Sequence, residues 1–349
     1  MIALVSMASP SWGALSGGRL DPQALLAATM LLRDATDVTL LAHINPDADA
    51  LGSALALGQV LRRRGATVRV SFGWPRVAPS ALAALDTDGL LVTADEVPAT
   101  PATLVVMDTG SVERLGPLGD RVAATIEAGG QVLVIDHHAT NTYFGTHNLV
   151  DATAEATAVL ALRLIDELGE VLTEPVARCL YAGLLTDTGA FRRATPSTHL
   201  IAARLVEAGV DTQAVSRELM DSHPFGWLGM LAKVLDGAVL EPAGARGLGW
   251  VWTTVSREQA RGLGIEEIDS VIDLVRTTRE AEVAAVLKEI EPGEWAVSLR
   301  AVARVDVGSV ALGLGGGGHR LAAGFTAVGE PEDIIPRLRA ALDAAPLLR

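Results

Sequence analysis

The sequence predicts an α/β protein of two domains, in which a larger domain built on a parallel sheet precedes a smaller α/β domain. The length of 349 residues favours two domains, because single hydrophobic cores rarely grow that large. Between residues 37 and 215, short apolar runs alternate with longer amphipathic segments, which is typical of a parallel sheet covered by helices. A second series of strand-like runs follows residue 236.

We expect strands in the first region at residues 38–42, 68–72, 104–107 and 132–135, because each run is short and apolar, like strands buried on both faces. Helices are expected at residues 51–64, 155–168, 176–187 and 198–208, and Gly65 and Gly209 are suited to end the first and last of these. A more polar helix is expected at 212–221. The second region should hold strands at 249–254, 281–289 and 295–301, a helical run at 268–276 and a closing helix at 331–344.

These elements set the expected boundaries. An N-terminal extension with a first helix occupies residues 1–36, the larger domain residues 37–215, a linker residues 216–235 and the smaller domain residues 236–349.

Composition limits the partners and the location of the chain. Acidic residues outnumber basic ones by 42 to 28, and the net charge of -14 argues against long duplex nucleic acid as a partner. No apolar run is long enough to span a membrane, so we expect no membrane partner. The N-terminus, MIALVSMASPSWGALSGGRL, is a poor signal peptide because no positive charge precedes Arg19. The chain has a single cysteine, Cys179, so it cannot form a disulfide within itself, and we expect a cytoplasmic protein. Cys179 lies in an apolar helical pattern, so we expect its thiol to be buried and inert.

Acidic residues and histidines gather directly after three of the expected strands. The first strand is followed by His43, Asp47 and Asp49, the third by Asp108, and the fourth by Asp136, His137 and His138. Ligands of open α/β sheets bind outside the carboxyl ends of the strands, so we expect these loops to converge. Asp187 adds a carboxylate at the end of an expected helix.

Such a cluster of carboxylates and imidazoles predicts bound metal. The charges would repel one another or take up protons unless cations neutralised them. Oxygen ligands with a minority of imidazoles and no thiolates suit Mn²⁺ or Mg²⁺. A pair of these ions can activate water and stabilise both the attacking and the leaving oxygen at phosphorus. The pattern therefore predicts hydrolysis of a phosphoester with two metal ions.

The segments HINPDADALGS, VVMDTG, VIDHHATN and LLTDTGAF resemble the motifs of the DHH phosphoesterase family, and GLGGGGHRLAAGF resembles its DHHA1 domain. In architecture and length the chain is similar to the NrnA group of bifunctional oligoribonucleases and 3′-phosphoadenosine 5′-phosphate (PAP) phosphatases, which includes enzymes acting on cyclic di-AMP and pApA. The resemblance implies a parallel-sheet DHH catalytic domain at 37–215 and a smaller α/β DHHA1 substrate-binding domain at 236–349 across a cleft. It implies short RNA oligonucleotides, dinucleotides, PAP or cyclic di-AMP as substrates, and we expect a homodimer.

The resemblance also implies a role for each motif residue. Two Mn²⁺ ions are the implied cofactors, with Mg²⁺ or Co²⁺ as substitutes. One ion would be held by His43, Asp47 and Asp108, and the other by Asp49, Asp108, His137 and Asp187, so that Asp108 bridges them. His138 would contact the scissile phosphate, Asp136 would orient a histidine, and Arg192 matches a family position near the phosphate.

Four consecutive glycines before His319 and Arg320 offer bare backbone amides beside two cations, a suitable cradle for an anionic group. A tight chain crossing that tolerates only glycine would give the same pattern. The resemblance makes this domain the one that recognises the nucleotide beside the scissile bond. Its candidate residues are Arg300, Gly316, Gly317, Gly318, His319 and Arg320, although the chain departs from the common family pattern after Arg300.

Two other functions fit part of the pattern. A manganese inorganic pyrophosphatase shares the N-terminal motifs but has a different C-terminal domain, without the GGGGH segment. A catalytically silent nucleotide sensor would keep the fold, yet every expected ligand is present here. His147, His199 and His223 lie outside the motifs and receive no role. Trp250, Trp252 and Trp295 are expected in the core, as aromatic residues in strands usually are.

Overall fold

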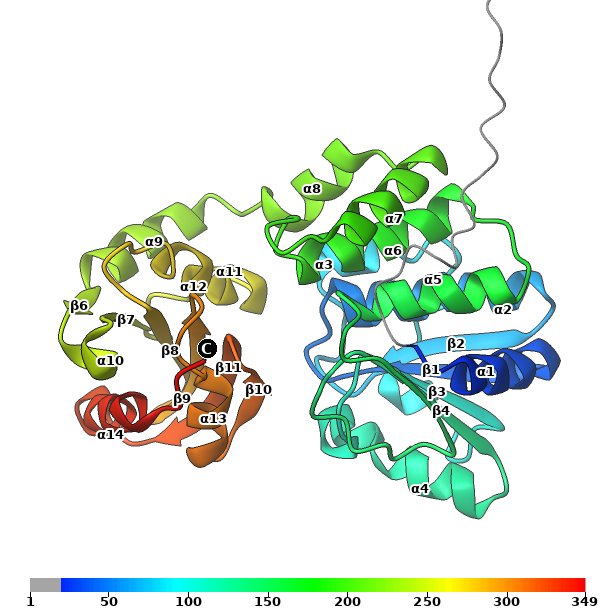
Figure 1. Cartoon of the computed structure of the whole chain (residues 1–349), viewed down its shortest axis with the longest axis horizontal. Helices are drawn as coiled ribbons and strands as arrows, with labels where there is room; N and C mark the ends of the chain where they lie inside the picture. The colour runs from blue at the N-terminus through cyan, green and yellow to red at the C-terminus, as the bar shows by residue number, and fades with distance from the viewer. Residues whose placement is uncertain (1–19, 349) are drawn as a thin grey trace, which may run out of the picture. The chain divides into compact units, whose positions relative to one another are not determined.

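The computed structural model describes residues 20–348, and the contacts within the chain divide it into two compact units between Ser222 and His223 (Figure 1). Residues 1–19, which carry most of the expected N-terminal extension and the stretch that makes a poor signal peptide, lie outside the described residues. Within residues 20–348, no helix is both long and apolar enough to cross a membrane.

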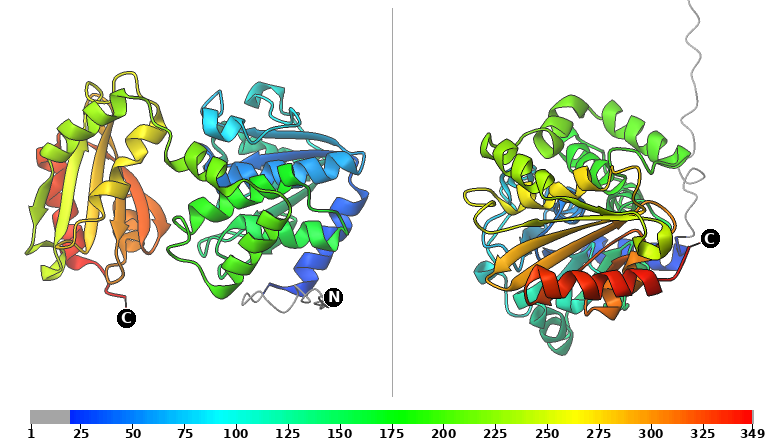
Figure 2. Two further views of the ribbon diagram at one scale, coloured as in Figure 1. Left: turned by 90° about the horizontal axis from the view of Figure 1, so that it is seen from above. Right: turned by 90° about the vertical axis from the view of Figure 1, so that its left-hand side faces the viewer.

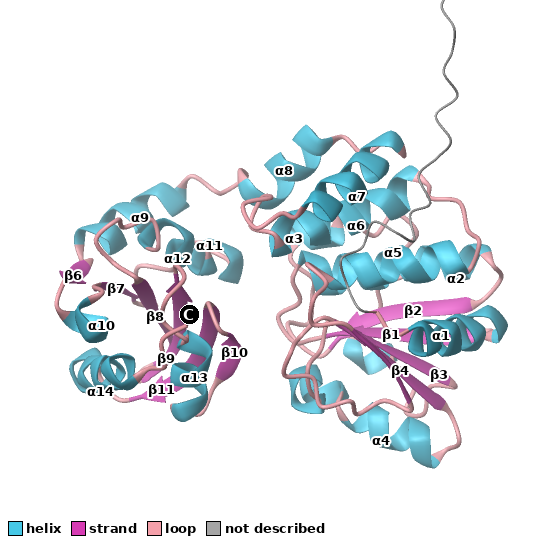
Figure 3. Ribbon diagram, in the orientation of Figure 1, coloured by secondary structure: helices cyan, strands magenta, loops and turns pink. Residues whose placement is uncertain are grey.

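The first unit is built on a five-stranded sheet in which every strand is parallel to its neighbours. Its strands are β1 (Asp37–Ala42), β2 (Thr67–Phe72), β3 (Thr103–Met107), β4 (Gln131–Asp136) and β5 (His147–Val150), in the spatial order β2-β1-β3-β4-β5 (Figure 3). The chain runs from β1 outward to β2 and then returns to the other side of β1 to form β3. The strand order therefore reverses between β1 and β3, which is where such sheets bind ligands.

Helices cover both faces of this sheet (Figure 1). One face packs against α1 (Pro22–Asp34), α2 (Ala48–Arg63) and α5 (Thr157–Glu167), and α6 (Glu174–Asp187) lies over α2 and α5. Further out lie α7 (Pro196–Glu207) and α8 (Thr212–Met220), and α3 (Ser80–Ala83) contacts α2 and α8. The opposite face is covered by the 3₁₀ helix η3 (Val112–Leu118) and α4 (Asp120–Glu127), and the short η2 (Ala94–Glu96) adds to that side. Because both faces are covered, β3 is buried along its whole length.

The four strands and four helices predicted in this region all form, with ends that differ by at most a few residues. Gly65 and Gly209 follow α2 and α7 with φ of 96° and 108°, the left-handed geometry expected of glycine after a helix. The sequence did not predict β5 or α4. The four residues of β5 include His147 and Asn148, so they lack the apolar run that marks the other strands.

The second unit is a six-stranded mixed sheet between two layers of helices (Figure 2). Its strands are β6 (Val239–Glu241), β7 (Trp250–Val255), β8 (Val283–Glu291), β9 (Glu294–Ala301), β10 (Gly317–His319) and β11 (Ala322–Val328), in the order β10-β11-β9-β8-β7-β6. One face packs on α10 (Gly244–Gly247), α13 (Val307–Gly313) and α14 (Pro331–Ala344), and the other on α9 (Gly226–Asp236), α11 (Ile265–Asp269) and α12 (Val271–Val275). With the parallel sheet of the first unit, this confirms the predicted α/β class.

The strands predicted at 249–254, 281–289 and 295–301 correspond to β7, β8 and β9, and the closing helix corresponds to α14. Trp250 and Trp295 are buried, as predicted for core residues. The sequence did not predict β6, β10, β11, α9 or α13. Helix α9 falls in the stretch 216–235 that was read as a linker, and its residues Met230 and Val234 pack into the core of the second unit.

Candidate metal centre

The acidic and histidine motifs meet at the carboxyl ends of β1, β3 and β4. His43 directly follows β1, Asp108 directly follows β3, and Asp136 ends β4 with His137 and His138 behind it. β1 and β3 are neighbours, so the first two motifs lie on either side of the point where the strand order reverses. The expected convergence of the three loops is therefore present.

His43, Asp47 and Asp108 form the first group of side chains that could hold a metal ion. Nε2 of His43 lies 3.7 Å from Oδ2 of Asp47 and 3.7 Å from Oδ2 of Asp108. Nδ1 of His43 lies 2.8 Å from the carbonyl of Ile44, and a carbonyl can only accept, so Nδ1 carries a proton. This hydrogen bond turns Nε2 toward the two carboxylates, which is how a metal-binding imidazole is usually oriented.

Asp49, Asp108 and His137 form the second group. Nε2 of His137 lies 3.4 Å from Oδ1 of Asp108 and 3.1 Å from Oδ2 of Asp187, so Asp187 adjoins this group. Nδ1 of His137 donates to the carbonyl of Ala154 at 3.2 Å, the same arrangement as in His43.

Asp49 is held by the N-terminus of α5. Its carboxylate accepts the backbone N–H groups of Thr157 at 2.6 Å and Ala158 at 2.9 Å, where the helix dipole favours a negative charge. Burial nevertheless raises the pKa of Asp49 well above its ordinary value, and the negative charges of Asp187 and Asp108 add to the rise.

Asp108 belongs to both groups and is the most constrained member of the site. Its backbone φ is 53°, a conformation that is unfavourable for a residue with a side chain and is typical of functional sites. Its Oδ1 accepts a hydrogen bond from Oγ1 of Thr157 at 2.8 Å. Burial, with the charge of Asp47, raises the pKa of Asp108 to about 6. The carboxylate of Asp108 thus faces the imidazole of His43 with one oxygen and the imidazole of His137 with the other.

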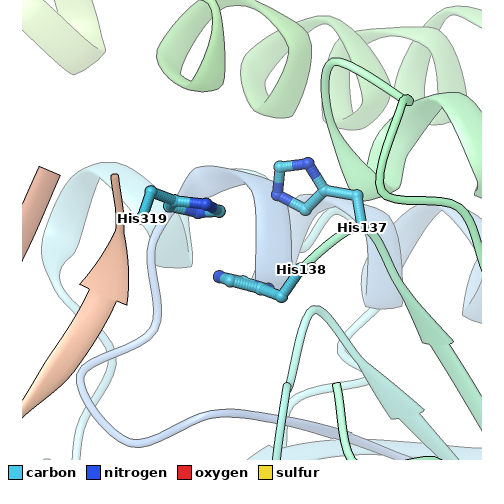
Figure 4. Close-up of side chains that lie close together, drawn as sticks. All are labelled: His137, His138 and His319. Carbon is cyan, nitrogen blue, oxygen red and sulfur yellow. The ribbon is translucent and has the colours of Figure 1, made fainter. Parts of the chain in front are cut away.

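His138 is oriented differently from the other two histidines. Its Nδ1 lies 2.7 Å from Oδ1 of Asp136, whose second oxygen accepts a hydrogen bond from the Asn141 side chain at 2.6 Å. Burial alone would raise the pKa of Asp136, but the hydrogen bonds from His138 and Asn141 outweigh it and keep the pKa below its ordinary value. Asp136 is therefore an anion that orients His138. Figure 4 shows the rings of His137 and His138, which leave the chain at the end of β4.

The carboxylates of the site carry negative charge that bound divalent cations would neutralise. Burial lowers the pKa of His137, but the hydrogen bond to Asp187 and the charge of Asp108 more than compensate and raise that pKa to about 11. A proton on this ring does what a cation would do, because it neutralises the surrounding carboxylates. Four carboxylates and two imidazoles, without a thiolate, form a donor set that suits Mn²⁺ or Mg²⁺. The residues present therefore fit the expected metals.

Two glycines bring the helices that carry Asp49 and Asp187 together. A Cβ atom on Gly52 of α2 would lie 2.5 Å from the carbonyl oxygen of Cys179 in α6. A Cβ atom on Gly183 of α6 would lie 2.6 Å from Oδ1 of Asp49. The close packing of α2 on α6 therefore depends on glycine at both positions, and it places the first turn of α2 against the last turn of α6.

The residues predicted to bind substrate lie in two places. Arg192 is exposed in the loop after α6, in the first unit. The others lie in the second unit: Arg300 on β9, Gly317, Gly318 and His319 on β10, Gly316 just before β10 and Arg320 just after it. Figure 4 shows the side chain of His319.

The glycines around β10 differ in their surroundings. A Cβ atom on Gly316 would lie 2.1 Å from the carbonyl oxygen of Gly324, and one on Gly318 would lie 2.7 Å from that of Ala322. Both glycines therefore allow β10 to lie close against its antiparallel neighbour β11. A Cβ atom on Gly317 would have nothing within 4 Å, and the same holds for Gly315, so the backbone is unobstructed at these two positions.

Sequence reasoning missed three residues near the centre. Asn141 holds Asp136, and Thr157 holds Asp108. Arg114 lies on η3, where its carbonyl accepts the N–H of Ile44, the residue after His43. Asn141 follows the two histidines at a short spacing and could have been noticed, whereas the roles of Thr157 and Arg114 depend on contacts between distant segments.

Comparisons with known proteins agree with this geometry. A family model described as the DHH family, N-terminal domain, matches residues 37–184, and one described as the DHHA1 domain matches residues 259–345. The bifunctional oligoribonuclease and PAP phosphatase NrnA of Thermus thermophilus is 33% identical over 82% of this chain and 83% of its own length. The probable bifunctional oligoribonuclease and PAP phosphatase NrnA of Streptococcus mutans is 27% identical over 85% of this chain and 92% of its own length.

Among solved structures, an exopolyphosphatase-related protein from Bacteroides fragilis is similar to the chain with a TM-score of 0.83. The similarity covers 93% of this chain and 97% of that protein at 21% sequence identity. At this level of identity the likeness concerns the fold.

Proposed function

The chain belongs to the DHH family of phosphoesterases, and from this premise we propose that it hydrolyses short oligoribonucleotides and PAP with two divalent cations, Mn²⁺ in the first place. The proposal includes dinucleotides such as pApA and extends to cyclic di-AMP. The relatives named as oligoribonucleases and PAP phosphatases support this substrate class, because similarity to them extends over most of the chain.

The position of Asp108 carries the proposal of two ions. Its Oδ2 faces Nε2 of His43, and its Oδ1 faces Nε2 of His137. A carboxylate with a separate imidazole on each oxygen is suited to bridge two cations. We therefore assign His43, Asp47 and Asp108 to one cation and Asp49, Asp108, His137 and Asp187 to the other.

Cations bound at these two groups would lower the pKa of a water molecule and neutralise charge on the phosphate. The chain itself would supply a hydrogen-bond donor through His138. Burial lowers the pKa of His138, but the hydrogen bond to Asp136 and the charge of Asp108 raise it above its ordinary value. We assign His138 to the scissile phosphate, because a firmly oriented imidazole that donates a hydrogen bond stabilises negative charge that develops in the transition state.

Two exposed arginines of the first unit are further candidates for the phosphates of the substrate. Within residues 20–348, the guanidinium groups of Arg114 and Arg192 form no hydrogen bond or ion pair. Arg114 is close enough to His43 for its charge to oppose the rise in the pKa of that ring. In a chain with a net charge of -14, isolated cations beside the centre favour small anionic substrates over long polyanions.

We assign the nucleotide next to the scissile bond to residues of the second unit. Arg300, His319 and Arg320 supply cations and hydrogen-bond donors, and Gly317 supplies an unobstructed backbone. Gly316 and Gly318 would act indirectly, by allowing the close pairing of β10 with β11.

A timed digestion of a substrate panel by the full chain tests the proposal. The panel contains pApA, PAP, cyclic di-AMP, a long RNA and pyrophosphate, each with Mn²⁺ or with EDTA, and the products are resolved by ion-exchange chromatography. We expect Mn²⁺-dependent release of AMP from pApA and PAP, with slower cleavage of the long RNA. If pyrophosphate is hydrolysed and no other substrate of the panel is, the chain is a pyrophosphatase instead. Binding of PAP without turnover would identify a sensor.

A further inference from the structure

The two arginines that follow Phe191 have different surroundings. Arg192 is exposed, and its guanidinium forms no hydrogen bond or ion pair within residues 20–348. Arg193 instead turns back toward α6, and its Nη2 donates a hydrogen bond to the backbone carbonyl of Asp187. Asp187 is the last residue of α6 and one of the proposed metal ligands. Both arginines are exposed, but Arg193 also contacts the backbone of a proposed metal ligand.

An unusual backbone produces this turn. Gly189, Ala190 and Phe191 have φ of 61°, 56° and 62°, three successive residues in the left-handed region. Two of them carry side chains, for which this region is unfavourable, so the surrounding contacts must hold the segment in place.

Several contacts hold the left-handed segment. The N–H of Phe191 donates to Oγ1 of Thr188 at 3.0 Å, and the N–H of Arg193 donates to the carbonyl of Thr188 at 3.0 Å. The ring centroid of Phe191 lies 5.8 Å from those of Tyr181 and His199, so the ring packs between α6 and α7. The segment is thus fixed on both sides of Ala190.

The far end of the loop is tied to the segment that also holds His137. Oε1 of Glu155 accepts hydrogen bonds from Oγ1 of Thr195 and, at 2.8 Å, from Oγ1 of Thr198 at the start of α7. Glu155 directly follows Ala154, whose carbonyl accepts the proton of His137. Loop 188–195 is therefore anchored at both ends to backbone that carries or orients a proposed metal ligand.

Glycine at position 189 favours the contact of Arg193. A Cβ atom there would lie 3.0 Å from Nη1 of Arg193, and the φ of 61° is already unfavourable for any residue with a side chain. Glycine thus leaves room for the guanidinium beside the end of α6, where it donates to the carbonyl of Asp187. At this place it satisfies a carbonyl that has no partner within the helix and opposes the negative end of the helix dipole.

We propose that Arg193 is a positioning residue that fixes Asp187 for the cation shared with Asp49, Asp108 and His137. The inference rests on the proposed function, because it assumes that Asp187 binds metal. Helix ends fray, and the side chain of Asp187 is 22% exposed, so burial alone does not fix it. Groups that orient a metal ligand typically alter metal affinity by about 10- to 100-fold.

The test compares Arg193→Met, Arg193→Lys and Arg192→Met in the full chain. Binding of Mn²⁺ is measured by electron paramagnetic resonance of the free ion, with folding checked by circular dichroism. We expect R193M to weaken one of two Mn²⁺ sites by about 10- to 100-fold and to leave the other unchanged. R193K should recover part of the loss. R192M, the matched control, should bind both ions like the wild type and raise KM for pApA.

Should R193M fail to fold, Gly189→Ala provides a second route, because the added Cβ would crowd the same guanidinium at 3.0 Å and strain a backbone φ of 61°. The same selective loss of one site is expected, with Asp187→Asn as the reference for complete loss. If R193M binds both Mn²⁺ ions like the wild type, or if both sites weaken equally, the role of Arg193 is overturned. The proposed function would still stand in that case. A wild-type protein that binds no Mn²⁺ would overturn the proposed function and this inference with it.

Discussion

Oδ1 of Asp108 lies 3.4 Å from Nε2 of His137, while Nδ1 of the same ring donates its proton to the carbonyl of Ala154. The ring therefore presents the nitrogen that faces the carboxylates as a metal ligand, provided that no proton occupies it. In the absence of metal, the pKa of His137 is raised to about 11, so we expect a proton on this nitrogen at neutral pH. Competition between protons and metal ions at this nitrogen leads to the first prediction.

Uptake of Mn²⁺ should release protons and weaken as the pH falls. Without metal, His137 is protonated below a pKa of about 11, and Asp108 becomes protonated below about 6. Both protons must leave before metal binds, so lower pH favours the metal-free state. We expect the Mn²⁺ affinity to drop by about tenfold per pH unit from pH 8 to pH 7 and more steeply below pH 6. Titration calorimetry in buffers of different ionisation enthalpy measures the released protons, and a pH-independent affinity would contradict the prediction.

Asn141→Ala should slow turnover without removing metal. The substitution deletes the 2.6 Å hydrogen bond to Asp136 and loosens the carboxylate that orients His138. We expect kcat for pApA to fall by about 10- to 100-fold, with the Mn²⁺ content unchanged. Thr142→Ala is the matched control, because its exposed hydroxyl, among the residues that the structure describes, donates to the carbonyl of Gly110 alone. Equal kcat values for pApA in the two variants would show that Asn141 does not orient His138 for turnover.

Alanine at Gly52 or Gly183 should destabilise the first unit. The added Cβ would meet the carbonyl oxygen of Cys179 at 2.5 Å or Oδ1 of Asp49 at 2.6 Å, and both neighbours belong to closely packed helices. Overpacking of this kind costs about 1–3 kcal/mol in the free energy of unfolding. Gly229→Ala in α9 is the control, because its Cβ would have nothing within 4 Å and alanine favours helix by about 0.5–1 kcal/mol. The midpoint temperature of thermal denaturation should therefore fall for G52A and G183A and rise for G229A.

Cys179 should be unreactive in the folded protein. Burial raises the pKa of its thiol to about 12, and the side chain is completely buried. The thiolate is the reactive form, so Ellman's reagent should leave the native protein unmodified and should titrate one thiol per chain in guanidinium chloride. Rapid reaction of the native thiol would show that α6 opens readily.

The sequence predicted the elements whose signal is local. β1 and β3 are uninterrupted apolar runs, and the motifs stand directly after them, so a parallel sheet was enough to expect His43 and Asp108 at one edge. β5 and β11 gave no such signal, because His147 and Asn148 in β5 and the small residues of β11 are typical of loops. These strands form because a neighbouring strand pairs with them.

The groups that orient the ligands could not be predicted for a similar reason. Thr157 contacts Asp108 only because α5 begins beside β3 and β4, and the guanidinium of Arg193 reaches Asp187 only because three residues adopt left-handed conformations. Residue type revealed the candidate ligands, whereas the contacts that hold them depend on tertiary structure.

The most direct test of this account is the number of Mn²⁺ ions bound per chain, measured by equilibrium dialysis for the wild type and for Asp108→Asn, together with turnover of pApA. We expect two ions in the wild type, and in D108N a loss of affinity at both sites and no measurable turnover in a folded chain. Two tightly bound ions and wild-type turnover in D108N would contradict it.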